Sequence, residues 1–340
     1  MAGEDLFVEK VRALSPRSPR LVVGIGDDAA VVQVHEGLLA ATTDLLVEGV
    51  DFLSGETPEA IGRRAFAVNL SDLAAMGARP EFFLLTVGFP RRLGAEYALA
   101  VARGALSRAA PLEAALAGGD LSDAPQTLVS IALWGRPVGS PLTRSGARPG
   151  DAVFLSGWPG RAAAGLRLAK MVAAFASQGA PPTPHLMGLA PEHEAELAAA
   201  YRDPEPRLEL GCGLARERLA TAAIDVSDGV GVDAARLARA SGVRIVIERE
   251  KLPVAPALRA YCEVESLDPT DLVLSGGDDY ELLFTAPDGT AGALEILASR
   301  CGVAVRRVGA CREGAGATVA ERTGERDISK LGFDHLEGPA

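Results

Sequence analysis

The sequence predicts an α+β protein of two domains, with residues 1–140 in the first domain and residues 141–340 in the second. Its 340 residues are the length of about two ordinary domains. Strand-like segments mix with segments of helical periodicity, but without the strict alternation of a doubly wound parallel sheet. A stretch rich in glycine, proline and serine, from Gly139 to Gly150, is predicted to contain the domain boundary.

Strands are predicted where short runs of β-branched and aliphatic residues are bounded by turn-forming residues. They are residues 21–23, 29–34, 38–43, 82–87, 127–134, 152–155, 244–247 and 281–285. Helices are predicted where apolar residues recur every three or four positions. They are residues 58–76, 95–110, 161–176, 192–201, 208–220, 231–240 and 291–300. The proline-rich residues 178–184 are expected to form a surface loop of the second domain.

The helix over residues 58–76 has the clearest local signals. Thr57 is a favoured N-cap residue, and Pro58 suits the first helical position because its missing N–H is not needed there. Gly77 follows the last apolar residue, where a left-handed backbone commonly ends a helix. Asp72 lies inside this otherwise apolar helix, where no turn requires it.

Charge and hydropathy exclude several classes of protein. With 34 basic and 45 acidic residues the formal net charge is −11, which does not favour binding to nucleic acid or to an anionic membrane. The longest apolar run, residues 82–89, is far shorter than the roughly 20 residues of a membrane span. The N-terminus lacks the apolar segment of a secretory signal. We therefore expect a cytoplasmic protein that binds neither nucleic acid nor membrane.

The four cysteines and four histidines have no metal-binding or redox spacing. The cysteines are expected to be reduced and mostly buried in packing.

Aspartates stand beside glycines or at the predicted ends of strands throughout the chain: Asp27, Asp28, Asp44, Asp120, Asp225, Asp228, Asp278 and Asp279. Each pair alone is readily explained as a turn, but Asp72 is not. If several of these carboxylates converge, their repulsion requires cations. Oxygen ligands suit hard ions, so we expect Mg²⁺, which also allows an acidic protein to bind phosphates.

The usual nucleotide motifs are absent. Residues 24–29 match the form G-x-G-x-x-A, but the residues that follow are strand-like, whereas a dinucleotide site requires a helix there. None of the four lysines, Lys10, Lys170, Lys251 and Lys330, follows a glycine as in a P-loop. The sequence also has no kinase H-R-D or D-F-G set and no G-x-S-x-G element.

Eight blocks in order along the chain resemble the thiamine-monophosphate kinases, which share a superfamily with aminoimidazole ribonucleotide synthetase. The blocks are GIGDDAAVV (24–32), TTDLLVEGVDF (42–52), AVNLSDLAAMGARP (67–80), GGD (118–120), LTRSGARPGD (142–151), AIDVSDG (223–229), LSGGDDYELLFT (274–285) and GFDHL (332–336). The resemblance implies a two-domain aminoimidazole ribonucleotide synthetase-like fold, in which the sheet of an N-terminal α/β domain forms a homodimer and a C-terminal α+β domain completes the active site. It implies ATP-dependent phosphorylation of thiamine monophosphate to thiamine diphosphate.

The resemblance also implies the roles of individual residues. The positions at which the family holds several Mg²⁺ ions are Asp28, Thr42, Thr43, Asp44, Asp72, Asp120, Asp225 and Asp228. The positions that contact ATP are Gly119, Asp120, Arg144 and Ser227. The positions that contact thiamine monophosphate are Asp51, Asp278 and Phe333. Asp44, Asp72, Asp120 and Arg144 are expected to carry the catalysis, with Arg144 facing phosphate because its planar fork suits bidentate contact.

Two positions depart from the family pattern. The family commonly has histidine at Asp51 and glutamate at Asp278. The second change shortens the reach by one methylene and keeps the charge, whereas the first replaces a donor by an acceptor. Asp51 is alternatively a solvated loop residue without a role in binding.

The chemistry of a phosphate acceptor agrees with direct in-line transfer of the phosphoryl group. A phosphate monoester with a second pKa of about 6 is already ionised near pH 7, so the reaction needs alignment and charge neutralisation and no general base. Two alternatives stay open: an ATP-dependent enzyme similar to aminoimidazole ribonucleotide synthetase, and a non-catalytic protein that binds ATP or a thiamine phosphate.

Overall fold

The computed structural model describes residues 10–16, 18–23, 31–32, 38–177, 188–334 and 338–339. The chain divides into two compact units, the first made of Met1–Leu73 and Ala78–Pro137 and the second of Ala74–Gly77 and Val138–Ala340. Both contain helices and mixed or antiparallel sheets, which confirms the predicted α+β class. No helix in the described ranges is long and apolar enough to cross a membrane. The predicted loop at residues 178–184 and the motif residues Asp27 and Asp28 lie outside the described residues.

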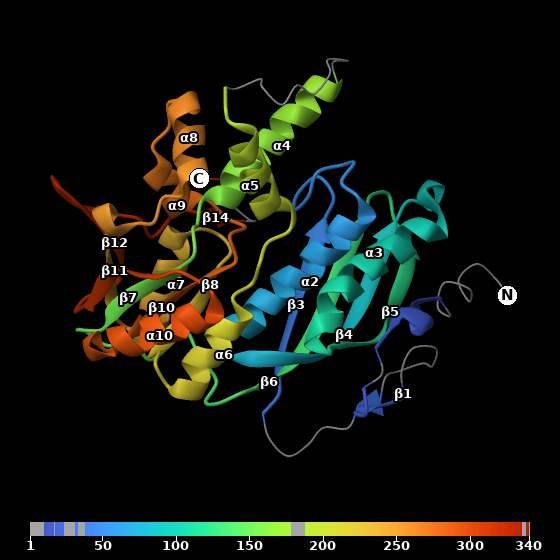
Figure 1. Cartoon of the computed structure of the whole chain (residues 1–340), viewed down its shortest axis with the longest axis horizontal. Helices are drawn as coiled ribbons and strands as arrows, with labels where there is room; N and C mark the ends of the chain where they lie inside the picture. Colours follow the sequence, from blue (N-terminus) through green and yellow to red (C-terminus); the bar gives the residue numbers. More distant parts are fainter. Residues whose placement is uncertain are drawn as a thin grey trace. The chain divides into compact units, whose positions relative to one another are not determined.

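The first unit is built on a four-stranded sheet with the order β3-β6-β4-β5. Its strands are β3 (Ala40–Val47), β4 (Ala78–Phe89), β5 (Ala115–Asp123) and β6 (Leu128–Pro137). β6 is antiparallel to both neighbours, whereas β4 and β5 are parallel. Helices α2 (Pro58–Ala75) and α3 (Gly94–Ala109) lie on one face of this sheet (Figure 1). The helical turns η1 (Arg91–Leu93) and η2 (Ala110–Leu112) flank α3.

Helices α2 and α3 of the first unit pack with their backbones in close contact. A Cβ on Gly62 would lie 1.9 Å from the carbonyl oxygen of Val101, and one on Gly104 would lie 2.0 Å from that of Glu59. Only glycine allows this approach. The signals at the ends of α2 are confirmed, because the Thr57 hydroxyl accepts a hydrogen bond from the Ala60 amide and Gly77 is left-handed, with φ of 64°.

Strand predictions in the first unit differ from the structure in extent, for example at β3, and β5 was not predicted. β3 runs on to Val47, whereas the prediction ended it at Thr43, and its continuation Leu45-Leu46-Val47 pairs with β6 in full register. Asp44 is therefore inside the strand and not at its end. Of the predicted strand at 29–34, only β2 (Val31–Val32) is described, and it pairs with β1 (Leu21–Val23).

The second unit is built on a seven-stranded sheet with the order β13-β12-β9-β11-β7-β10-β8. The strands are β7 (Ala152–Ser156), β8 (Ala222–Val226), β9 (Arg244–Glu248), β10 (Glu281–Ala286), β11 (Val305–Arg312), β12 (Gly316–Glu321) and β13 (Gly324–Asp327). All pairs are antiparallel except β9 with β12. A separate short pair joins β14 (Phe333–Asp334) to β15 (Gly338–Pro339).

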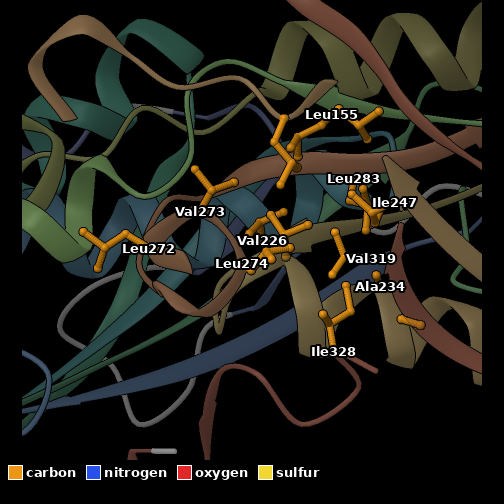
Figure 2. Close-up of a cluster of buried hydrophobic side chains, with 14 of the residues drawn as sticks. Leu155, Val226, Ala234, Ile247, Leu272, Val273, Leu274, Leu283, Val319 and Ile328 are labelled. Carbon is orange, nitrogen blue, oxygen red and sulfur yellow. The ribbon is translucent and has the colours of Figure 1, made fainter. Parts of the chain in front are cut away.

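Alternating residues of this sheet enter two different cores. Val153 and Leu155 belong to one core, while Ala152 and Phe154 belong to the other. The first core also holds residues of α4 (Arg161–Ser177), α5 (Pro191–Arg202), α7 (Val230–Ser241), α8 (Pro256–Glu265) and α9 (Pro269–Ser275). The second holds residues of α6 (Leu208–Glu217) and α10 (Ala291–Cys301). Figure 2 shows the first core around Val226, Leu274 and Leu283.

Several elements of the second unit were not predicted: β8, β11, β12, β13, α8 and α9. β13 has the sequence Gly-Glu-Arg-Asp, which has low strand propensity and is held by pairing with β12. α9 did carry a usable signal, because Asp268 caps it and Pro269 occupies its first turn. Two turns, η3 (Arg249–Lys251) and η4 (Asp288–Thr290), complete the unit. Cys212, Cys262 and Cys311 are buried and Cys301 is half-buried, which agrees with the prediction that the cysteines are mostly buried in packing.

Candidate active site

In the first unit, β3 and α2 bring two of the predicted metal-binding residues together. The Thr42 hydroxyl donates a hydrogen bond of 2.5 Å to Oδ2 of Asp72 on α2. Thr42 and Asp44 are two residues apart on a strand, so their side chains share the face that α2 covers. The burial of β3 alternates accordingly, with Thr42 and Asp44 half-buried and Thr43 and Leu45 exposed. This face offers a hydroxyl and two carboxylates.

Asp120 lies on the opposite face of the same sheet. It pairs with Thr86 of β4, and Thr86 in turn pairs with Ser130 of β6. Ser130 pairs with Leu45, whose side chain is 54% exposed on the face away from Asp44. Residues paired across strands share a face, so Asp120 lies on the same face as Leu45. In addition, β5 is three strand spacings from β3, a distance of about 14 Å. Within this unit the structure does not bring Asp120 next to Asp72.

Asp120 is also inside its strand, because β5 continues through Leu121 to Asp123. The sequence analysis singled it out only as an aspartate beside glycines and did not predict β5. Gly119 is fixed by packing, since a Cβ there would lie 1.8 Å from the carbonyl oxygen of Leu85. Thr43 shares the exposed face with Leu45 and therefore with Asp120.

Asp51 stabilises a turn at the end of β3. Its Oδ2 accepts a hydrogen bond of 2.8 Å from the Val47 amide, and its own amide donates to the Val47 carbonyl at 2.9 Å. This is the local side-chain-to-backbone bonding that favours aspartate in turns. The residue thus has a structural function that explains an acceptor at this position.

In the second unit, three separated sequence blocks meet at the loop after β8. The amide of Asp278 donates to the Ser227 carbonyl at 2.7 Å, and the amide of Phe333 donates to the Asp228 carbonyl at 2.9 Å. The amide of Tyr280 donates to the Val226 carbonyl at 2.8 Å. Main-chain hydrogen bonds therefore place the predicted substrate residues Asp278 and Phe333 directly beside the predicted ATP and metal residues Ser227 and Asp228.

An arginine holds the Asp228 carboxylate and a buried aspartate holds the Asp228 amide, and neither residue was predicted. Nη1 of Arg236 lies 2.5 Å from Asp228 Oδ2 and 2.7 Å from Asp233 Oδ1. Asp233 Oδ2 accepts from the Asp228 amide at 3.1 Å. Burial and the neighbouring Asp228 raise the pKa of Asp233 to about 6, against the opposing effect of Arg236. Asp233 lies in the first turn of α7, five residues after Asp228, where an acidic residue is common, so the sequence alone did not single it out.

Asp279 and Glu281 anchor the segment that follows Asp278. Asp279 accepts from the amides of Gly160, at 2.6 Å, and Ala162, at 3.3 Å, at the start of α4. Glu281 is 1% exposed and pairs with both Nε and Nη2 of Arg207, at 2.6 and 2.7 Å. Burial raises the pKa of Asp279 to about 8. Burial also opposes ionisation of Glu281, but Arg207 nevertheless lowers the pKa of that carboxyl.

The remaining predicted residues are separate. Asp225 is 4% exposed inside β8. Arg144 is exposed in the turn-rich stretch, where its carbonyl accepts from the Ser241 hydroxyl at 2.9 Å. Asp28 lies outside the described residues.

The oxygen donors suit Mg²⁺. In the part of the chain that the structure describes, no three His, Cys, Asp or Glu side chains gather closely enough to hold a metal ion. Mg²⁺, however, is normally held by one or two carboxylates together with water and substrate phosphates. The Thr42 and Asp72 pair is a donor set of this kind, with neither sulfur nor imidazole in the contact.

Known proteins resemble the chain along almost its whole length. The family models of the AIR synthase related protein match residues 26–136 with the N-terminal domain and residues 148–320 with the C-terminal domain. The thiamine-monophosphate kinase of Rhodopirellula baltica is 34% identical over 348 residues, which cover 98% of this chain and 98% of that protein.

Solved structures agree with these similarities. The thiamine-monophosphate kinase from Stenotrophomonas maltophilia K279a has a TM-score of 0.79 and 35% identity, covering 92% of this chain and 95% of that one. AaThiL complexed with AMPPCP and TMP has a TM-score of 0.75 and 31% identity, covering 98% of this chain and 95% of that one.

Proposed function

The chain belongs to the thiamine-monophosphate kinase family, and from this membership we propose that it transfers the γ-phosphoryl group of ATP to thiamine monophosphate, giving thiamine diphosphate and ADP. A phosphate oxygen of thiamine monophosphate attacks the γ-phosphorus, and the bond from that phosphorus to the β-phosphate oxygen breaks. The observation that carries the proposal is the meeting of the blocks around Ser227, Asp278 and Phe333 in one loop cluster. A relative of the same fold is known with AMPPCP and TMP bound.

The acceptor and the nucleotide are proposed to contact different residues. Asp278 and Phe333 would contact thiamine monophosphate, while Ser227, Arg144, Gly119 and Asp120 would contact ATP. Asp51 is the third residue that the family resemblance implies for thiamine monophosphate, and its carboxylate accepts a hydrogen bond from the amide of Val47 in its own turn. No general base is required, because the acceptor phosphate is ionised near pH 7. The residues act by binding and aligning two anions.

Magnesium is the proposed cofactor. The residues that would hold it are all oxygen donors: Asp28, Thr42, Thr43, Asp44, Asp72, Asp120, Asp225 and Asp228. Bound Mg²⁺ would neutralise charge between the two phosphate groups. The Thr42 hydroxyl orients the Asp72 carboxylate, and Arg236 does the same for Asp228.

We further propose a homodimer in the cytoplasm. The face of the first unit's sheet that carries Thr43 and Asp120 includes the 54% exposed side chain of Leu45. Pairing of this face with a second copy is the arrangement that the family resemblance implies. It would place the Asp120 face, which does not meet Asp72 in one chain, against another protein surface.

Product analysis tests the proposed activity. Purified protein is incubated with ATP, Mg²⁺ and thiamine monophosphate, beside a control without Mg²⁺. Formation of thiamine diphosphate only with the metal is the expected result. Release of ADP without that product would indicate another acceptor, such as that of an enzyme similar to aminoimidazole ribonucleotide synthetase. Binding of both ligands without any turnover would identify a non-catalytic binding protein.

A further inference from the structure

Tyr280 contacts the side chain of the proposed substrate residue Asp278. The Tyr280 hydroxyl donates a hydrogen bond of 3.0 Å to Asp278 Oδ1. The tyrosine is only 8% exposed, whereas Asp278 is half-buried. An ionised carboxylate accepts hydrogen bonds and donates none, so the direction of this bond is fixed. A buried and therefore rigid donor thus holds one oxygen of a more accessible carboxylate.

The backbone around this contact is unusual. Asp278 has φ of 68° and Tyr280 has φ of 50°, so two non-glycine residues are left-handed within three positions. Such residues persist only where their surroundings fix them. Here the surroundings act through two main-chain hydrogen bonds. The amide of Asp278 donates to the Ser227 carbonyl at 2.7 Å, and the amide of Tyr280 donates to the Val226 carbonyl at 2.8 Å. These bonds do not involve the tyrosine hydroxyl, so removing that hydroxyl leaves the backbone anchored.

We propose that Tyr280 is a positioning residue, which orients the Asp278 carboxylate for recognition of thiamine monophosphate and not of ATP. The proposal rests on the proposed function. Asp278 is one methylene shorter than the glutamate common in the family, so its carboxylate stays close to the backbone, within reach of a hydroxyl two residues away. Orientation by Tyr280 would reduce the conformational freedom that binding must otherwise remove.

A double-mutant cycle tests this inference. Tyr280→Phe removes one oxygen and is expected to raise the dissociation constant for thiamine monophosphate, measured by calorimetry, by about three- to tenfold, the cost of ordering one more side chain on binding. The KM for ATP is expected to change less than about twofold. Asp278→Ala is expected to weaken thiamine monophosphate binding, and adding Tyr280→Phe to it is expected to have no further effect, because the tyrosine acts through the aspartate.

Tyr261→Phe is the matched control, since Tyr261 is 3% exposed on α8 and belongs to the packed core. Thermal unfolding of each variant shows whether it is folded. The positioning role would be overturned if Tyr280→Phe weakened thiamine monophosphate binding as much in the Asp278→Ala protein as in the wild type. It would also be overturned if Tyr280→Phe affected ATP and thiamine monophosphate equally. A wild-type protein that binds thiamine monophosphate without phosphorylating it would refute the proposed activity, while the calorimetric cycle would still decide the role of Tyr280. Absence of any thiamine monophosphate binding would refute both.

Discussion

The two units hold their candidate site residues in different ways. In the first unit, Thr42 and Asp72 project from a regular strand and a regular helix and meet through a single side-chain hydrogen bond. In the second unit, Ser227, Asp228 and Asp278 lie in loops that main-chain hydrogen bonds join. These loops also contain left-handed residues and adjoin the buried pair of Glu281 with Arg207.

In the first unit the residues of the site are not the ones that maintain the fold, whereas in the second unit they are. A side chain of the first unit's site can be altered while the strand and helix that carry it keep all their hydrogen bonds. In the second unit, the charged residues that surround the site also hold the loops in place, so changes there are expected to affect folding and binding together. Substitutions in the two units should therefore fall into two classes, one that loses activity at unchanged stability and one that loses stability.

The largest effect is expected from Arg207→Met in the second unit. It leaves the Glu281 carboxylate, 1% exposed, without its cation, and breaking such a buried pair destabilises a protein by about 3–5 kcal/mol. Urea unfolding measures the change in the free energy of unfolding. Arg322→Met is the matched control, because its pair with Glu250 has side chains that are 92% and 77% exposed and is expected to contribute less than about 1 kcal/mol. Equal effects of the two variants would show that the buried pair of Arg207 with Glu281 does not hold the loops of the second unit in place.

In the first unit, Asp72→Asn is expected to lower kcat by at least about 100-fold, or about 2.7 kcal/mol of transition-state stabilisation, with unchanged stability. Asparagine still accepts the Thr42 hydrogen bond, but it lacks the charge that would hold a cation. Asp44→Asn is expected to behave in the same way. Asp123→Asn, at an exposed pair with Arg91, is the control. Turnover like that of the wild type in both Asp44→Asn and Asp72→Asn would contradict the proposed metal site.

The sequence was most informative where local patterns determine structure. α2, with its threonine cap, its initial proline and its final glycine, begins as predicted and ends one residue early, and Asp72 stood out because an apolar helix does not need it. Strand ends were less predictable. Asp44 was expected where its strand stops, yet cross-strand pairing with β6 extends the strand past it.

Contacts between distant segments lay beyond sequence reasoning. Nothing local to Arg236 indicates that it would hold Asp228, and nothing local to Phe333 indicates that its amide would meet the same loop. β13 forms only because β12 supplies its hydrogen bonds. The blocks of the site were thus identifiable one by one, but their neighbours depend on tertiary packing.

A pH dependence of stability should belong to the second unit. The pKa of Asp279 is raised from 3.8 to about 8 by burial, so the folded state keeps a proton that the unfolded chain loses. The stabilisation from this group is complete below pH 4, decreases as the pH rises to about 8, and is lost above that. One proton corresponds to about 1.4 kcal/mol per pH unit. Asp279→Asn is expected to remove this slope in urea unfolding between pH 5 and 8.

The matched control is Asp288→Asn, whose side chain is 65% exposed. If the free energy of unfolding of the wild type changed with pH in the same way as that of Asp279→Asn, Asp279 would be ionised in the folded protein. The two backbone amides of α4 would then outweigh its burial.

The smallest expected effect tests the side-chain contact of the first unit. Thr42→Val keeps the shape of the residue and removes the donor to Asp72 Oδ2. A hydrogen bond of this kind contributes about 1 kcal/mol, so the Mg²⁺ concentration for half-maximal activity is expected to rise about fivefold while urea unfolding changes little. Thr318→Val removes the same kind of donor from an exposed carboxylate, that of Glu325, and is expected to leave the Mg²⁺ requirement unchanged. If Thr42→Val instead destabilised the protein without altering the Mg²⁺ requirement, the Thr42–Asp72 bond would be part of the architecture, and the first unit would resemble the second in coupling its site to its fold.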